Sequence, residues 1–186
     1  MNSIFNRKLK LHQIVKISLF SILLFLLITE FIIFPPVITY LVSGISMEPS
    51  LHDGQRIYLL ANYVSNNYQR GDIVIFVFTQ NKEQSRTLPD GRIRKRKIAW
   101  ERTFVKRIFG LPGDSVLIRD GVIYVNYQPV QKTYSLEPPK EDYGPVIVDE
   151  GHYFVLGDNI NISMDSRDPE IGMVAKEQIL GKIIFK

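Results

Sequence analysis

The sequence predicts a mainly β protein, with an antiparallel sheet or partly closed barrel behind one N-terminal transmembrane helix. Two observations carry this prediction. A long apolar run lies near the N-terminus, and the rest of the chain consists of short runs of Val, Ile, Phe and Tyr separated by Gly, Pro and Asp. Short runs of this kind with close turns are typical of sandwiches and barrels.

The apolar run extends from Ile17 to Phe34 and contains only four other residues, Ser18, Ser21, Thr29 and Glu30. As a helix it spans roughly 27 Å, which is close to the hydrocarbon thickness of a bilayer. The dipeptide Pro35-Pro36 then ends the helix. We therefore predict a transmembrane anchor over residues 17–36.

The charges before this run predict its orientation. Arg7, Lys8, Lys10 and Lys16 precede it, and no acidic residue does. The positive-inside rule then places residues 1–16 in the cytoplasm and residues 42–186 outside, as an extracytoplasmic domain on a single-pass anchor in the plasma membrane. A cleavable signal peptide is the alternative, but it requires a small-residue cleavage site, and no alanine occurs before Ala61.

After the anchor, seven segments have the composition of strands. They are Arg56–Leu60, Asp72–Phe78, Thr103–Phe109, Ser115–Arg119, Val122–Asn126, Val146–Val148 and Tyr153–Leu156. Asp120-Gly121, between two of these segments, predicts a hairpin turn. Lys176–Leu180 predicts a short helical turn.

Two stretches predict loops, residues 80–100 and residues 136–144. Residues 80–100 are polar and basic and contain the turn Pro89-Asp90-Gly91, so we expect a long hairpin tip or a mobile loop. Its basic cluster, from Arg92 to Lys97, is either a solvated surface or a site for anionic lipid. Nucleic-acid binding is not expected outside the cytoplasm. Residues 115–152 leave room for only a small insertion in the domain.

The composition excludes some classes of function. The chain has 186 residues and no cysteine. This length suits one anchor and one domain, and the lack of cysteine excludes disulfides, thiol catalysis and cysteine-ligated metals. We predict no metal and no cofactor.

Three blocks of sequence carry a candidate active site. The first is Ser43-Gly44-Ile45-Ser46-Met47-Glu48-Pro49-Ser50, the second runs from Phe104 to Asp114, and the third from Gly157 to Arg167. In this order and behind an apolar segment, they resemble the type I signal peptidases, which are serine proteases with a lysine general base. The resemblance covers residues 43–186 and implies a fold of mostly antiparallel sheet.

The resemblance implies that Ser46 is the nucleophile and Lys106 the general base. A serine hydroxyl needs a base to take its proton, and a lysine accepts a proton only if burial lowers its pKa from about 10.4. In a strand, Phe104 and Ile108 share a face with Lys106 and would bury its amine. Without the resemblance, a turn serine and an exposed lysine would be the plainer interpretation, and a triad with His52 or His152 stays open.

Further residues match the family blocks. The resemblance implies that the Ser163 hydroxyl contacts the lysine amine, and that Asp165 and Arg167 hold their block in shape as an ion pair. Some members carry a serine as oxyanion donor where this chain has Gly44, so the backbone N–H of Ser46 is the donor that remains. A further hypothesis, from neighbouring motif positions, is an ion pair between Arg107 and Asp158.

These observations predict a membrane-bound endopeptidase that removes signal peptides from exported preproteins after small residues, at Ala-x-Ala sites. Its partners are preproteins and membrane lipids, without nucleic acid, and we expect a monomer. Two alternatives stay open. One is a specialised Ser/Lys processing protease, for example for conjugation proteins. The other is a catalytically silent, membrane-anchored binding protein with the same fold, against which the intact Ser46 and Lys106 argue.

Overall fold

The computed structural model describes residues 2–33, 37–130, 134 and 137–185, and it divides into two units, residues 1–37 and 38–186. The first unit consists of helix α1 (Asn2–Ile33), in which residues 12–28 are all exposed. None of the described helices combines the length and hydropathy that a bilayer crossing requires. The apolar run is thus helical as far as Ile33, but its assignment as a transmembrane anchor is not borne out. Residues 34–36 of that prediction lie outside the described residues.

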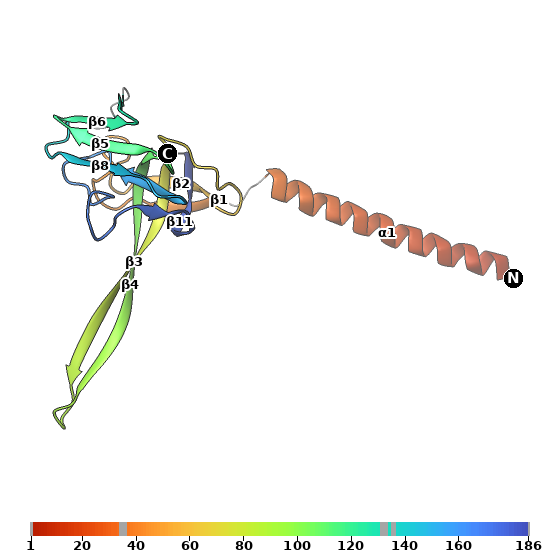
Figure 1. Cartoon of the computed structure of the whole chain (residues 1–186). Coiled ribbons are helices and arrows are strands. Elements are labelled where there is room, and N and C mark those ends of the chain that lie inside the picture. The colour runs from red at the N-terminus through yellow and green to blue at the C-terminus, as the bar shows by residue number, and fades with distance from the viewer. Residues whose placement is uncertain (1, 34–36, 131–133, 135–136, 186) are drawn as a thin grey trace. The chain divides into compact units, whose positions relative to one another are not determined.

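The second unit contains two antiparallel sheets (Figure 1). The larger has the strand order β1-β2-β11-β3-β4-β9-β10, and the smaller has the order β7-β6-β5-β8. The strands are β1 (Val37–Leu41), β2 (Arg56–Ala61), β3 (Ile73–Thr87), β4 (Ile93–Gly110), β5 (Ser115–Arg119), β6 (Val122–Val125), β7 (Gln128–Pro129), β8 (Tyr143–Ile147), β9 (His152–Leu156), β10 (Val174–Ala175) and β11 (Ile179–Phe185).

The prediction of a mainly β, antiparallel fold is confirmed, but the partly closed barrel is wrong. Among the described strands, the larger sheet ends at β1 and β10, which do not pair with each other. β10 has only two residues, and the pairings of β11 with β3 and of β4 with β9 both shift register. Short edge strands and bulges of this kind end the pairing of a sheet instead of closing it.

Three clusters of buried apolar side chains form the core. Alternate residues of β3 point to opposite faces of the sheet, so Val74 and Phe76 belong to one cluster while Ile75 belongs to another. The cluster that contains Ile75 also contains Met47, whose side chain is 1% exposed. The core therefore fixes the position of the segment around Ser46.

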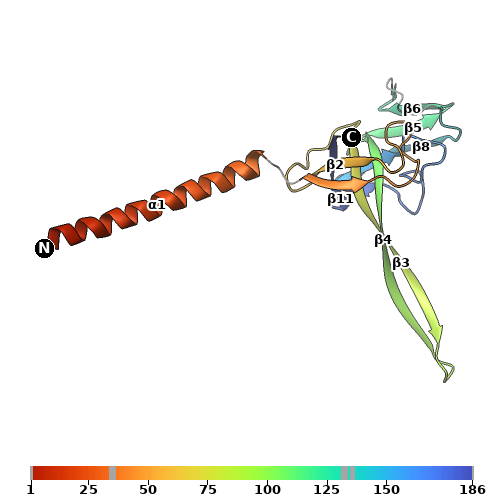
Figure 2. The same ribbon diagram turned by 180° about the vertical axis from the view of Figure 1, so that it is seen from behind.

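The central strands continue beyond the sheet as a two-stranded ribbon (Figures 1 and 2). β3 and β4 pair without a register shift from Ile73↔Arg107 to Thr87↔Ile93, and residues 88–92 form the connecting turn. The hairpin tip expected within residues 80–100 is confirmed, but the expected loop is mostly strand. Where side-chain exposure is described, most of this ribbon is exposed on both faces, so its sequence lacks the apolar alternation that marks a half-buried strand.

The insertion at residues 115–152 contains the smaller sheet. Its first two strands are joined at Asp120-Gly121, where Arg119 pairs with Val122, and both turn residues have a positive φ, 50° and 76°. Positive φ at both central residues is the type I′ hairpin turn, so this prediction is confirmed. The helical turn expected over Lys176–Leu180 is a 3-10 helix of three residues, Lys176–Gln178, before β11 begins.

Gly110, at the end of β4, leaves no room for a side chain. A Cβ at this position would lie 2.8 Å from Cγ2 of both Val116 and Val148, and 3.0 Å from Cβ of Phe154. We expect Gly110→Ala to lower the free energy of unfolding by about 1–3 kcal/mol, because overpacking displaces buried neighbours. Denaturant unfolding of the purified chain measures the loss.

A second variant separates crowding from a backbone effect at this glycine. Val148→Ala removes one of the crowding methyl groups, so the double variant should lose less stability than the sum of the two single changes. Strict additivity would show that the methyl of Val148 does not oppose the new Cβ.

Candidate active site

The structure brings Ser46 and Lys106 together although sixty positions separate them in the sequence. Ser46 lies in the segment between β1 and β2, and Lys106 lies on β4. Lys106 Nζ and Ser46 Oγ are hydrogen-bonded at 2.8 Å. The lysine side chain is buried and the serine is half-buried. The two groups are thus placed for a proton transfer between them.

The segment that carries Ser46 is held on both sides. After it, Met47 and Leu51 are buried, and the Leu51 N–H donates to the carbonyl of Met47 at 2.9 Å. Before it, Gly44 has a φ of +88°, which side chains rarely allow, and its N–H donates to Asp53 Oδ1 at 2.7 Å. Sequence reasoning missed Asp53, because its contact is to a backbone atom.

The third sequence block also holds this segment. The Asn159 N–H donates to the carbonyl of Ser46 at 3.0 Å, and its side-chain Nδ2 donates to the carbonyl of Ile45 at 3.2 Å. A Cβ on Gly157 would lie 2.6 Å from the Ser46 carbonyl and would overlap the side chain of Ser163. The sequence analysis gives no role to Asn159 or Gly157. Their position in the third block, as part of Gly157-Asp158-Asn159, is the feature of the sequence that could have indicated one.

Burial changes the acidity of Lys106. The residue is 2% exposed, and its Nζ lies 5.7 Å from the ring centroid of Phe104, as the shared strand face predicted. Desolvation lowers the pKa of the amine from 10.5 to about 8, while the negative charges of Asp165 and Asp158 oppose this by raising the pKa. A substantial fraction of the amine is therefore neutral near this pH.

The hypothesis of an ion pair between Arg107 and Asp158 is confirmed. Arg107 Nε lies 2.8 Å from Oδ1 and Nη2 lies 2.6 Å from Oδ2, and both side chains are buried. The guanidinium also donates to the carbonyl of Gly71 and to Ser50 Oγ, and it lies 3.7 Å from the ring centroid of Tyr134. One arginine thus joins β4, the segment after Ser46 and the third block.

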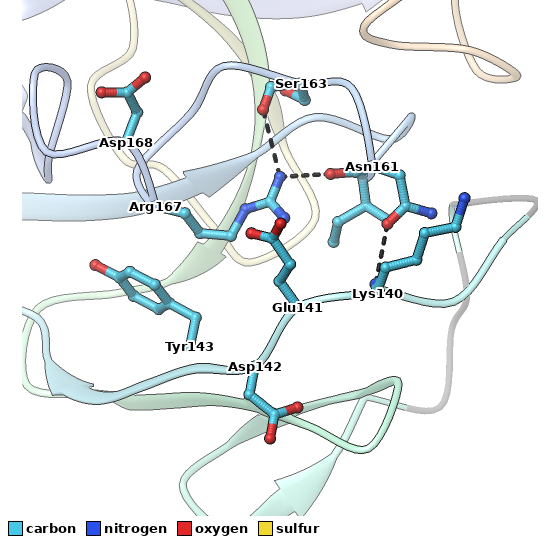
Figure 3. A pocket seen from close by; sticks show the side chains of 9 residues that line it. Lys140, Glu141, Asp142, Tyr143, Asn161, Ser163, Arg167 and Asp168 are labelled. Carbon is cyan, nitrogen blue, oxygen red and sulfur yellow. Dashed lines mark hydrogen bonds between the residues drawn. The ribbon is translucent and has the colours of Figure 1, made fainter.

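The predicted ion pair of Asp165 and Arg167 is also present. Arg167 Nε and Nη2 lie 2.8 and 2.9 Å from the two carboxylate oxygens, and Asp165 accepts the N–H of Gly157 at 3.1 Å. Arg167 Nη2 also donates to the carbonyls of Ile160 and Ser163 (Figure 3). These bonds fix the course of the loop that follows β9.

Ser163 is placed differently from its prediction. Its hydroxyl is buried and has no hydrogen-bond partner among the described residues, so the expected contact with the Lys106 amine is not made. The neighbours Ile162 and Met164 line the groove beside Ser46, whereas Ser163 and Arg167 line a separate pocket of about 310 Å³ (Figure 3). The physical reason is that the contacts of Arg167 direct this part of the loop toward the second pocket.

An open groove of about 570 Å³ runs past the two candidate catalytic residues. It is lined by Tyr40, Leu41, Val42, Ser43, Gly44, Ser46, Met47, Ile75, Arg102, Thr103, Phe104, Val105, Lys106, Ile162 and Met164. Most of these side chains are apolar, and part of the lining comes from β1, the strand at the edge of the larger sheet. The histidines of the alternative triad are not among the lining residues.

Comparisons with known proteins identify relatives over nearly the whole chain. A family described as signal peptidase, peptidase S26, matches residues 11–186. Signal peptidase I of Bacillus licheniformis is 38% identical over 192 residues, which cover 97% of this chain and 90% of that protein. Signal peptidase I T of Bacillus subtilis (strain 168) is 37% identical over 184 residues, which cover 91% of this chain and 82% of that protein. The crystal structure of a signal peptidase I from Enterococcus faecalis V583 is similar with a TM-score of 0.45 and 27% identity, over 63% of this chain and 97% of that one.

The Arg107–Asp158 pair generates a prediction on stability. Arg107→Gln leaves the fully buried carboxylate of Asp158 without its cation, and we expect a loss of about 3–5 kcal/mol in the free energy of unfolding. Arg70→Gln is the matched control, because Arg70 pairs with Asp114 but is 44% exposed. Denaturant unfolding compares the variants.

The double variant Arg107→Gln/Asp158→Asn should be more stable than Arg107→Gln alone, because it removes the unpaired charge. A loss for Arg107→Gln no larger than that for Arg70→Gln would contradict the structural importance of this pair.

Proposed function

We propose that the chain is a membrane-bound serine endopeptidase that cleaves N-terminal signal peptides from preproteins. The chain belongs to the signal peptidase family, peptidase S26, and the proposal proceeds from this membership. In this proposal Ser46 is the nucleophile and Lys106 the general base. The observation that carries it is the 2.8 Å hydrogen bond between the buried amine of Lys106 and the hydroxyl of Ser46 in the wall of an open groove.

The first half of the reaction forms an acyl-enzyme. Ser46 Oγ attacks the carbonyl carbon of the scissile bond while its proton passes to the neutral amine of Lys106. The resulting ammonium group then gives this proton to the leaving amine, and the C–N bond breaks. In the second half, Lys106 takes a proton from a water molecule while the water oxygen attacks the acyl carbon. The C–O bond to Ser46 then breaks, and the ammonium group of Lys106 returns the proton to Ser46 Oγ.

The backbone N–H of Ser46 is the proposed donor to the oxyanion. Among the described residues it has no hydrogen-bond acceptor, so it remains available to the negative charge that develops during the attack. Gly44 supports this role because its backbone conformation, with a φ of +88°, shapes the turn before the nucleophile.

Ser163, Asp165 and Arg167 have positioning roles in the proposal. Asp165 and Arg167 fix the loop that carries Ser163. The Ser163 hydroxyl is buried and has no partner among the described residues, so its lone pairs are available for a contact with the ammonium form of Lys106. We propose that this contact forms when Lys106 takes up the proton of Ser46.

The groove supports a preference for small side chains next to the cleaved bond. An extended peptide can pair with the free edge of β1, and alternate side chains would then face the apolar wall formed by Val42, Ile75 and Phe104. Shallow apolar subsites of this kind favour small residues, typically alanine, at the first and third positions before the cut.

Membrane attachment through residues 17–36 is part of the proposal. The described residues of this stretch within 17–28 are all exposed, and most are large and apolar. Apolar surface of this extent is characteristic of membrane or protein contacts. The basic residues before it support a cytoplasmic N-terminus and an extracytoplasmic catalytic domain.

The proposed roles of Ser46 and Lys106 predict the outcome of two substitutions. Ser46→Ala and Lys106→Met should each reduce cleavage of a preprotein with an Ala-x-Ala site by at least about 10³-fold, since each removes one partner of the proton transfer. The controls are Ser65→Ala and Lys176→Met, which change the same residue types outside the groove. Cleavage is followed with purified protein in detergent micelles.

Retained cleavage in either site variant would overturn the assigned pair. No cleavage by the wild type would instead favour a specialised processing protease or a silent binding protein.

The pKa of Lys106 predicts the pH dependence of activity. Its depressed value of about 8 means that the amine is protonated and inactive at lower pH and becomes neutral as the pH rises through 8. We expect kcat/KM to fall about tenfold per pH unit well below this value. Measurement from pH 5 to 10 tests this, and a limb near the usual pKa of histidine, about 6.5, would point to His52 or His152 as the base.

A further inference from the structure

The ribbon carries the positive charge of the chain. Residues 82–102 contain eight basic and three acidic side chains, a net charge of +5, whereas the whole chain has a net charge of +4. The remainder of the chain is therefore slightly negative. Neither residue of the proposed catalytic pair lies in this segment, and of its charged residues only Arg102 lines the groove, so the reaction proposed above assigns no role to the other charges.

The pairing register sorts these charges onto two faces. Directly opposite residues of an antiparallel pair share a face, and successive residues alternate. Glu83 lies opposite Lys97, and it also lies 3.6 Å from Lys95, so both lysines share a face with a carboxylate. Arg86 lies opposite Arg94 on the other face.

We call this other side the arginine face and define it by Arg86, Arg94, Arg96 and Trp100. Arg96 lies opposite Gln84, and Trp100 lies opposite Gln80. No position that β3 or β4 contributes to this face between residues 80 and 100 is acidic. In the described part of the chain, none of its three arginines forms an ion pair. At its base, Gln80 contacts the carboxylate of Glu170.

The charges of the arginine face lower the stability of the free protein. Like charges directly opposite each other, as in Arg86 and Arg94, destabilise a sheet, and no carboxylate of β3 or β4 lies on this face to offset them. Its guanidinium groups are exposed, and guanidinium binds phosphate through paired hydrogen bonds. Trp100 is 58% exposed, and tryptophan is enriched at the boundary between lipid and water.

We propose that the arginine face binds the anionic surface of a phospholipid membrane, with the arginines on lipid phosphates and Trp100 at the headgroup level. The arginines lie on one side of the strands near the turn, and Trp100 lies on the same side four residues nearer to the sheet, so the ribbon binds by this side and not by the turn alone. This inference rests on the membrane location of the proposed function, which brings the ribbon close to lipid. It assigns the ribbon a role separate from catalysis.

The chain carries its own probe for this contact, because Trp100 is its single tryptophan. The full chain is reconstituted in vesicles of phosphatidylcholine alone and in vesicles with about a third of phosphatidylglycerol. Tryptophan emission is then recorded with and without brominated lipid, which quenches an indole at the headgroup level. We expect a blue shift and quenching with the anionic lipid, lost in high salt because exposed charges are screened.

Two double variants with the same loss of charge test the face. Arg94→Gln/Arg96→Gln removes two charges from the arginine face and should weaken the ribbon's partition onto anionic lipid about 30-fold. Lys95→Gln/Lys97→Gln removes two charges from the opposite face and should retain most of the quenching. All four side chains are exposed, so folding is not at risk.

Equal losses in the two variants would overturn the assignment to one face, and equal quenching in both kinds of vesicle would overturn the role of anionic lipid. Quenching of Trp100 by a single-stranded oligonucleotide in micelles, without a response to lipid, would show that the face binds nucleic acid instead of lipid.

Preprotein cleavage by the same samples in micelles separates this inference from the proposed function. Active enzyme without quenching contradicts only the lipid contact, and quenching without cleavage contradicts only the peptidase.

Discussion

The burial of the Lys106 amine is the constraint on which the site depends. An amine in water keeps its proton at neutral pH, so this residue can act as a base near neutral pH only where burial disfavours its charged form. Asp158 and Asp165 raise its pKa and so work against this condition. Each of them is already bound by two hydrogen bonds to an arginine, Arg107 or Arg167. These pairs neutralise the carboxylates locally, so the acids can shape the site with less stabilisation of the ammonium form.

The same burial requires that Ser46 be brought to the amine, since the amine cannot move out to it. The segment around Ser46 is attached to the rest of the domain through several of its residues. Met47 fixes it to the core, Gly44 to Asp53, and the Ser46 carbonyl to the N–H of Asn159. The hydrogen bond between Ser46 and Lys106 is therefore the result of three independent attachments.

The sequence predicted those parts of the molecule that depend on side-chain pattern. The strand with Phe104 and Lys106 on one face and the hairpin at Asp120-Gly121 follow from periodicity and turn chemistry. The ion pair of Arg107 with Asp158 followed from neighbouring motif positions. The predictions that failed concern features that side-chain pattern does not determine. Closure of a sheet is decided by bulges and edge length, and neither leaves a clear signal in one sequence.

The predictions of a loop at residues 80–100 and of a contact between Ser163 and Lys106 failed for related reasons. A ribbon exposed on both faces has no apolar period, so residues 80–100 have the composition of a loop. The direction of the Ser163 side chain depends on bonds that Arg167 makes to backbone carbonyls, and Asn159 and Asp53 also act through backbone atoms. Because every residue carries the same backbone groups, contacts to them cannot be inferred from residue types.

Strand β4 joins the arginine face, the groove and the core in one continuous element. Its residues pass from Arg94 and Arg96 through Arg102–Lys106 in the groove wall to Gly110 between buried side chains. A strand rises about 3.3 Å per residue, so the ten residues from Arg96 to Lys106 span about 33 Å. An upright ribbon, in contact with lipid only at its turn, would hold Ser46 and Lys106 farther than that from the lipid. A ribbon that lies lengthwise keeps the groove close to the membrane surface, where a peptide bond just outside a membrane-inserted signal sequence is found. The placement of the arginines and Trp100 on one side of the ribbon therefore agrees with the proposed cleavage of a substrate close to the membrane.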